Sequence, residues 1–361
     1  MKWKTRLVLH ESVFTALVFT SAAYSYYFFS IWGIQDQYNV GPLRNYLTSN
    51  LVHVELLMVG ILFGLLIAII NRITDTPRLR KRPVIMIVMY RTLLYLFSLG
   101  IITIMVLLVF ILFIYPWEMM RDMFSALTPR YALSFAVWLI LVVAGINLSL
   151  EIQRVVGPGN IWRLLIGKYR QANEENRVFL FMDLKGSTTI AEELGHKKYS
   201  ELIQECYHDL TQVVLRFESE IYQYVGDEVV MSWSFEKNIS AYKSVLSFFA
   251  YRNILNQKEE EYKARFGIVP EFRGGIDVGA VSIIEVGDVK REIVYHGNVL
   301  NTAARLLELC KSREEQLIVS KTIGEYAIQH KSLEINWLDE VSLRGKKTNV
   351  GAYSIQSDND A

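Results

Sequence analysis

Cysteine is scarce in this chain, which has only Cys206 and Cys310 among 361 residues. Two cysteines are too few for a disulfide framework or a zinc cluster, and the chain has no Cys and His spacing typical of a structural metal site. We therefore interpret both as ordinary cytosolic thiols.

An excess of charge of either sign is also missing, because 38 Lys and Arg residues against 37 Asp and Glu residues leave a net charge of +1. A chain without a basic excess has no bulk attraction for polyanions, so we expect no nucleic-acid partner. The hydrophobic content of 52% is only slightly high, but the apolar residues are concentrated in the first 150 positions.

Charged residues are absent from the middle of four apolar stretches in that first part, at 13–32, 56–71, 92–117 and 131–150. Each approaches the roughly 20 residues that a helix needs to cross a bilayer. One such stretch alone would fit a buried core helix. Four in succession, with Trp or Tyr at several ends, predict a membrane domain over 1–155 with helices at 12–33, 52–72, 92–116 and 131–151.

Ionisable residues deep in a span would suggest transport, but His10, Glu11 and Glu55 lie near the ends of these stretches. A transporter or channel is therefore disfavoured, and the short outer loops show no sensor motif. The first stretch is too long for a cleavable signal, and no small-residue cleavage site follows it.

Basic residues are concentrated before the first stretch and between the second and third, where the segment 72–82 holds five of them. The other two loops hold few. The positive-inside rule therefore predicts a multi-pass protein of the cell (inner) membrane, with the bilayer as a partner and with the N-terminus and the second half of the chain in the cytoplasm.

A connector is expected over 156–176. Gly157-Pro158-Gly159 breaks the fourth helix, and Asn160 can cap a short amphipathic helix that follows. The connector is either a passive spacer or a helix that pairs with its copy in a dimer.

Alternating strand and helix patterns begin at position 177. We expect a buried strand at 178–184, a long helix after it, and a hairpin at 221–233. A helix at 239–262, two strands within 272–287, a helix after Gly297 and a last hairpin at 337–355 complete an α+β domain over 177–357.

Two aspartates occupy unusual places, because Asp183 ends the buried strand and Asp227 lies in the hairpin turn. Each alone fits a turn residue or helix cap. Together they can bind Mg²⁺, which takes one or two carboxylates and completes its shell with water and phosphate oxygens. Gly186, Ser187 and Thr188 open the following helix, whose free N–H groups suit a phosphate.

Basic and amide side chains could complete such a site. Asn301 and Arg305 are spaced i, i+4 on one helix face, and Lys346 lies at a glycine turn. A solvated surface charge is the alternative for each cation.

Four motifs carry a family resemblance: FMDLKGSTTIAEELG, YQYVGDEVV, GNVLNTAARL and LRGKKTNVGAY. Over about 177–356 the chain resembles the catalytic domain of class III nucleotidyl cyclases, which convert a nucleoside triphosphate to a 3′,5′-cyclic nucleotide and pyrophosphate for intracellular signalling. The resemblance implies a ferredoxin-like βαββαβ core with an extra hairpin, joined here to the four-helix α-helical transmembrane domain. It also implies two Mg²⁺ (or Mn²⁺) ions as cofactors.

The resemblance assigns roles by position. Asp183 and Asp227 would hold the metals, Asn301 would orient the ribose, Arg305 would stabilise charge on the α-phosphate, and Lys346 would bind the triphosphate. Backbone contacts to metal or phosphate fall on Leu184, Lys185, Gly186, Ser187, Thr188 and Thr189. A homodimer is implied, because the family takes the aspartates from one chain and the Asn and Arg from the other.

Two base-selecting positions depart from the family pattern. Gln223 stands where adenylyl cyclases have Lys and guanylyl cyclases Glu, and Val294 stands where adenylyl enzymes have Asp or Thr. We expect ATP, while GTP or a pyrimidine triphosphate stays open. His296 is interpreted as a turn residue. Glu228 is expected to point away from Asp227 as a structural residue. An inactive nucleotide-binding receptor is the alternative function, but the complete catalytic set favours an enzyme.

Overall fold

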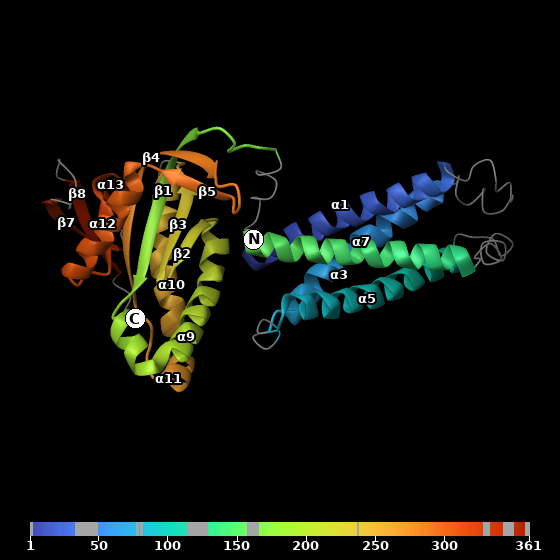
Figure 1. The fold of residues 1–361 in the computed structure, drawn as a ribbon, viewed down its shortest axis with the longest axis horizontal. Helices are drawn as coiled ribbons and strands as arrows, with labels where there is room; N and C mark the ends of the chain where they lie inside the picture. Colours follow the sequence, from blue (N-terminus) through green and yellow to red (C-terminus); the bar gives the residue numbers. More distant parts are fainter. Residues whose placement is uncertain are drawn as a thin grey trace. The chain divides into compact units, whose positions relative to one another are not determined.

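The structure is a computed structural model that describes residues 3–32, 50–76, 79, 82–113, 129–156, 166–236, 238–327, 333–341 and 350–357. The chain forms two compact units, Met1–Pro158 and Gly159–Ala361. Figure 1 shows the helices and strands of the two units.

The first unit consists, in its described part, of long helices: α1 (Trp3–Trp32), α3 (Asn50–Thr74), α5 (Val84–Phe113) and α7 (Pro129–Val156). Phe63, Tyr95 and Val143 are completely buried between them, whereas many large apolar side chains face outward. Gly60 and Gly64 lie one turn apart on α3, where a Cβ atom would collide with Thr20 or with the α1 backbone. Small residues at this spacing permit the close helix contact typical of membrane bundles.

Three helices among the described residues are long and apolar enough to cross a membrane, at Asn50–Thr74, Val84–Phe110 and Leu133–Gln153. These helices suggest membrane association. α1 is helical over its expected span but is not among the three; its C-terminal third carries the polar hydroxyls of Tyr24, Ser25, Tyr26 and Tyr27. The expected four-helix membrane domain is therefore not confirmed as a whole.

Arg91 lies outside the span expected at 92–116 but inside the observed helix α5. Its side chain is 3% exposed and forms an ion pair with Glu151 of α7, while its Nε donates to Thr74 Oγ1 of α3 at 3.1 Å. The expectation that charges occur only near span ends therefore missed a buried ion pair that joins three helices.

Neighbouring polar groups extend this connection. The Tyr95 hydroxyl donates to Asn71, and Asn147 Nδ2 donates to Val88 O at 2.8 Å and to Thr92 Oγ1 at 3.0 Å. Because burial makes an unpaired polar group costly, these bonds fix how α3, α5 and α7 pack together.

The second unit contains one eight-stranded sheet in the order β2-β3-β1-β4-β6-β8-β7, with β5 paired to β4. Its strands are β1 (Asn173–Leu184), β2 (Glu220–Val225), β3 (Glu228–Ser234), β4 (Phe272–Val286), β5 (Glu292–His296), β6 (Leu317–Ser320), β7 (Leu333–Val341) and β8 (Val350–Ser357). Its helices are α9 (Ser187–Phe217), α10 (Asn238–Gln257), α11 (Glu259–Phe266), α12 (Asn298–Ser312) and α13 (Lys321–Ala327). The elements β1-α9-β2-β3-α10-β4 form the expected βαββαβ core, because β1 lies antiparallel between β3 and β4.

β1 is buried on both faces, which explains its continuous apolar run. Val178, Leu180 and Met182 belong to the core under α9 and α10, while Phe179 and Phe181 belong to a second core with residues of α12. This double burial fixes the register of the strand that ends at Asp183.

Two expectations about this unit need correction. The segment expected as two strands at 272–287 is the single strand β4, and the expected helix at 239–262 divides into α10 and α11. Gly275 in β4 allows α12 to approach closely, because a Cβ there would collide with the α12 backbone at Ala303 and Leu307.

The connector also differs from the expected helix over 156–176, because β1 already begins at Asn173 and residues 166–170 form turns. Tyr169 is buried in the second core of this unit rather than on a helix face. Residues 157–165 lie outside the described part of the chain. The last hairpin is present as β7 and β8, but its turn, with Lys346, also lies outside.

We predict that Glu151→Gln lowers the free energy of unfolding of the full chain in detergent by about 3–5 kcal/mol, because a buried guanidinium loses its carboxylate partner. Replacing Arg91 and Glu151 together by methionine should cost less than the sum of the single changes. Glu259→Gln, which removes an exposed ion pair with Lys263, should have no comparable effect. Equal effects of the two glutamate changes would contradict the role of the buried pair.

Candidate active site

Asp183 lies at the end of β1, where cross-strand pairing fixes its neighbours. It pairs with Glu228 of β3 on one side and with Arg273 of β4 on the other. Directly opposed residues of antiparallel strands project from the same face. Glu228 therefore lies beside Asp183, so its expected role as a purely structural residue is too narrow.

Asp227 occupies a two-residue turn between β2 and β3. Gly226 precedes it with φ +63°, and Val225 pairs with Glu228 across the hairpin. A glycine with positive φ at the first turn position is typical of a type II′ hairpin. The Tyr207 hydroxyl of α9 lies 2.9 Å from Gly226 O and 3.1 Å from Glu228 O, so one donor serves the two carbonyls that flank Asp227.

Burial and neighbouring charges act on two of these carboxylates. Burial raises the pKa of Asp183, the Lys311 ammonium opposes this shift, and the charge and hydrogen bonding of Asp227 add to it. Burial also raises the pKa of Glu228, with further increases from Asp183 and Asp227. Asp183 and Asp227, two partly buried carboxylates close to each other, favour a cation beside them.

The start of α9 lies next to this cluster in the chain. Gly186 adopts φ +69°, which favours glycine, and the helix begins at Ser187 without a side-chain cap. The N–H groups of the first turn have no partner within the helix and can bind an anion. Leu184 and Lys185 join the strand to this turn, and Lys185 Nζ forms an exposed pair with Glu271 at 3.0 Å.

α12 carries the amide and guanidinium groups predicted for the site. Asn301 is exposed, and Arg305 Nη1 lies 2.7 Å from both carboxylate oxygens of Glu308. Lys311, near the end of the same helix, contacts Asp183 Oδ2 at 2.5 Å. A rise of 1.5 Å per residue puts Asn301 about 15 Å from Lys311 along the axis. The structure thus separates Asn301 from the carboxylates of its own chain.

The two predicted base-selecting residues lie on neighbouring segments. Gln223 is exposed on the edge strand β2, and Val294 is partly buried on β5. Their chain neighbours Tyr222 and Tyr295 stack edge-to-face with ring centroids 4.8 Å apart.

A divalent metal fits this donor set. The Lys311 ammonium shows that a cation is stabilised at Asp183, and the hard carboxylate oxygens are those that Mg²⁺ or Mn²⁺ binds. No cluster of three or more His, Cys, Asp or Glu side chains arranged for a metal is found within the described part of the chain. Mg²⁺ itself uses one or two carboxylates and takes its other ligands from water and phosphate.

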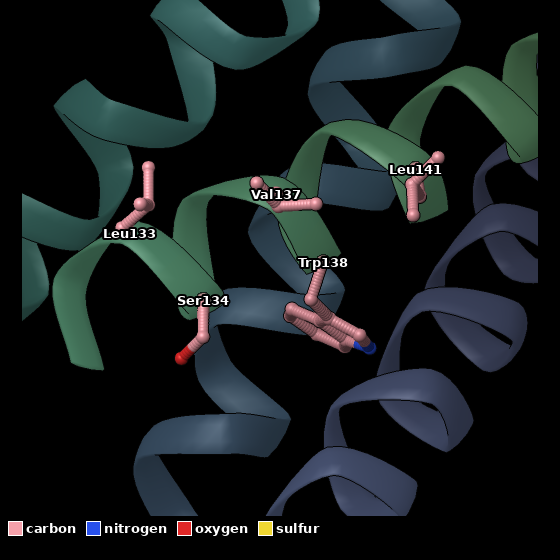
Figure 2. A pocket seen from close by; sticks show the side chains of 5 residues that line it. All are labelled: Leu133, Ser134, Val137, Trp138 and Leu141. Carbon is pink, nitrogen blue, oxygen red and sulfur yellow. The ribbon is translucent and has the colours of Figure 1, made fainter. Parts of the chain in front are cut away.

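A hollow of about 500 Å³ in the first unit is unrelated to this chemistry. Figure 2 shows its lining side chains, all from α7: Leu133, Ser134, Val137, Trp138 and Leu141. The lining contains no charged group, so it offers nothing to bind a polyphosphate.

Sequence reasoning missed two features of the site: the contact of Lys311 with Asp183, and the position of Glu228 opposite Asp183. Lys311 is 128 residues from Asp183 in the chain, and no local pattern links them. For Glu228 the alternation within the hairpin was visible, but the pairing partner was not.

Residues 170–357 match the family model described as adenylate and guanylate cyclase catalytic domain. Adenylate cyclase 2 of Rhizobium meliloti (strain 1021) is 31% identical over 171 residues, which are 47% of this chain and 47% of that protein. The matched region therefore spans about half of that relative. A bacterial light-regulated adenylyl cyclase structure has a TM-score of 0.51 at 16% identity, covering 60% of this chain and 62% of its own, and shows the fold alone.

We predict that Tyr207→Phe weakens Mn²⁺ binding about two- to tenfold, because a lost hydrogen bond of about 0.5–1.5 kcal/mol loosens the turn that carries Asp227. Binding can be measured by the loss of the free Mn²⁺ signal in electron paramagnetic resonance. Tyr224→Phe is the matched control, because Tyr224 packs its ring on Tyr207 from the same hairpin. Equal binding by both variants would refute the positioning role.

Proposed function

The chain belongs to the adenylate and guanylate cyclase catalytic domain family, and we propose that it is a membrane-anchored nucleotidyl cyclase, a phosphorus–oxygen lyase that converts ATP to 3′,5′-cyclic AMP and pyrophosphate for intracellular signalling. The observation that carries the proposal is the close approach of Asp183 and Asp227 beside the open start of α9. This arrangement supports binding of a metal-complexed triphosphate.

Asp183 and Asp227 would hold two Mg²⁺ or Mn²⁺ ions. When bound, the metals supply Lewis acidity toward the ribose 3′-hydroxyl and neutralise phosphate charge. The N–H groups of Ser187, Thr188 and Thr189 orient phosphate oxygens. In the reaction, the 3′-hydroxyl loses its proton to water, its oxygen forms a bond to the α-phosphorus, and the bond to the β-phosphate oxygen breaks to release pyrophosphate.

Cationic side chains would stabilise the negative charge that develops on the phosphates in this step. Arg305 has a guanidinium already held by a carboxylate at 2.7 Å, and it would exchange Glu308 for the α-phosphate. Lys346 is proposed to bind the triphosphate, and Asn301 to orient the ribose.

ATP is proposed as the substrate because the relative from Rhizobium meliloti is an adenylate cyclase. Gln223 can both donate and accept hydrogen bonds, and Val294 offers an apolar surface, so the adenine edge would be read chiefly by the glutamine.

A homodimer is proposed because Asn301 lies about 15 Å along α12 from the residue that touches Asp183. One chain would supply the aspartates of a site, and the other chain would supply Asn301 and Arg305. Exposure of Asn301 supports a role toward a second chain.

Four membrane helices are proposed, with α1 joining the three that are long and apolar enough. The N-terminus and the catalytic unit would then both lie in the cytoplasm, where the substrate is found. Placement of the basic residues supports this orientation.

The test is to incubate the purified full chain with ATP, GTP, CTP or UTP and Mg²⁺ or Mn²⁺, and to identify the products by mass spectrometry. We expect cyclic AMP and pyrophosphate in equal amounts from ATP. A dimeric protein that forms no cyclic nucleotide would refute the enzyme, and a different cyclic product would refute the choice of base.

Asp227→Ala should lower the rate by about 10²–10³-fold or more, because the charge that neutralises a metal is lost. Asp288→Ala is the matched control, since Asp288 is an exposed residue that also follows a glycine with positive φ, Gly287. Similar rates for the two variants would show that Asp227 holds no metal.

Mixed chains test the shared site. Asp183→Ala and Arg305→Ala chains should each be inactive alone, but half of the dimers in an equal mixture would have one intact site. The unselected co-expressed mixture should then show about one quarter of the wild-type activity, and a different affinity tag on each chain demonstrates the heterodimer. No recovery in a mixture shown to contain heterodimers would indicate that each site lies within one chain.

A further inference from the structure

Lys311 makes a contact that the reaction does not explain. Its Nζ lies 2.5 Å from Asp183 Oδ2, although the two residues are far apart in the sequence. The position is supported from β4 as well, because Arg273 Nη1 donates to Lys311 O at 3.0 Å and Arg273 pairs with Asp183 across the sheet. The end of α12 is thereby held against the end of β1.

The charges explain why a lysine is stable there. Asp183 stands directly opposite Glu228 in the pairing of β1 with β3, and Asp227 is the residue next to Glu228 in the chain. Carboxylates that share a partly buried site repel, and an opposite charge in contact lowers that cost. The Lys311 ammonium provides one positive charge directly at Asp183.

The same position conflicts with a metal ion. Mg²⁺ binds carboxylate oxygens at about 2.0–2.1 Å. An ammonium 2.5 Å from the same oxygen would stand in or beside the metal's coordination shell and would repel it. The lysine and the metal therefore cannot both bind Asp183 Oδ2 in this geometry.

We propose that Lys311 is an internal competitor for the metal, which occupies Asp183 in the metal-free protein and is displaced when a divalent ion binds. This inference rests on the proposed metal site at Asp183 and Asp227. The side chain of Lys311 is 45% exposed, so the displaced ammonium can move into water at little cost. Lys311 thus sets how much metal the protein requires.

The test measures Mn²⁺ binding to the full chain in detergent by electron paramagnetic resonance, without nucleotide, so that turnover plays no part. Lys311→Met should bind Mn²⁺ about two- to fivefold more tightly, which is the range expected for the loss of a partly exposed ion pair. Lys311→Arg, which keeps the charge, should stay near wild type. Lys243→Met is the matched control, because Lys243 forms a similar pair with Glu218 at 2.7 Å and is 31% exposed.

Unchanged or weaker Mn²⁺ binding by Lys311→Met would overturn the proposal. Asp183→Asn separates this failure from failure of the metal site itself. If Asp183→Asn binds Mn²⁺ as the wild type does, the proposed site is wrong; if it binds weakly while Lys311→Met is unchanged, only the competition is wrong.

A second measurement uses the wild-type protein and does not depend on a variant's folding. Reductive methylation followed by mass spectrometry reports how accessible each lysine amine is. Saturating Mn²⁺ should increase labelling of Lys311 and leave labelling of Lys243 unchanged. Equal labelling of Lys311 with and without bound Mn²⁺ would also overturn the proposal.

Discussion

Repulsion among Asp183, Asp227 and Glu228 is the constraint on which the second unit depends. Three carboxylates meet where β1 ends and where the β2–β3 hairpin turns, and burial raises the pKa of two of them. Such a group of like charges lowers stability unless a cation joins it. Packing in the rest of the unit holds these carboxylates together despite their repulsion. A cation beside them would reduce that repulsion and so stabilise the folded unit.

Packing can meet this cost because β1 is apolar on both faces. Its side chains alternate between a core under α9 and α10 and a core that includes α12. A slip of one residue would exchange the two faces, so the register is strongly fixed, and with it the position of Asp183 opposite Glu228 and Arg273. Tyr207 fixes the adjacent turn by a separate route, from α9.

Sequence reasoning succeeded where a feature is local. The strand before Asp183 and the turn at Asp227 are short patterns bounded by Gly186 and Gly226, whereas the βαββαβ core was implied by the family resemblance. Sequence reasoning failed where a feature depends on contacts between segments that are distant in the chain. The register that opposes Glu228 to Asp183 depends on two strands, and the Lys311 contact depends on the packing of α12. The continuity of β4 depends on its pairing with β1 along its whole length, which no local pattern shows. Arg91 was missed because an apolar window ends at a charge, whereas the helix continues through it.

Each unit neutralises a buried carboxylate with a basic side chain, but the two ion pairs differ in how easily they can separate. In the first unit, Arg91 and Glu151 are 3% and 14% exposed, so separating them would leave charges in an apolar interior, and the pair acts as a fixed connection. In the second unit, the side chain of Asp183 is likewise only 14% exposed, but that of its partner Lys311 is 45% exposed. An ammonium that can return to water is a replaceable partner. The two acids are equally buried, so the difference lies in the basic residue. A buried arginine makes a structural ion pair, whereas an exposed lysine leaves a site that can exchange its cation.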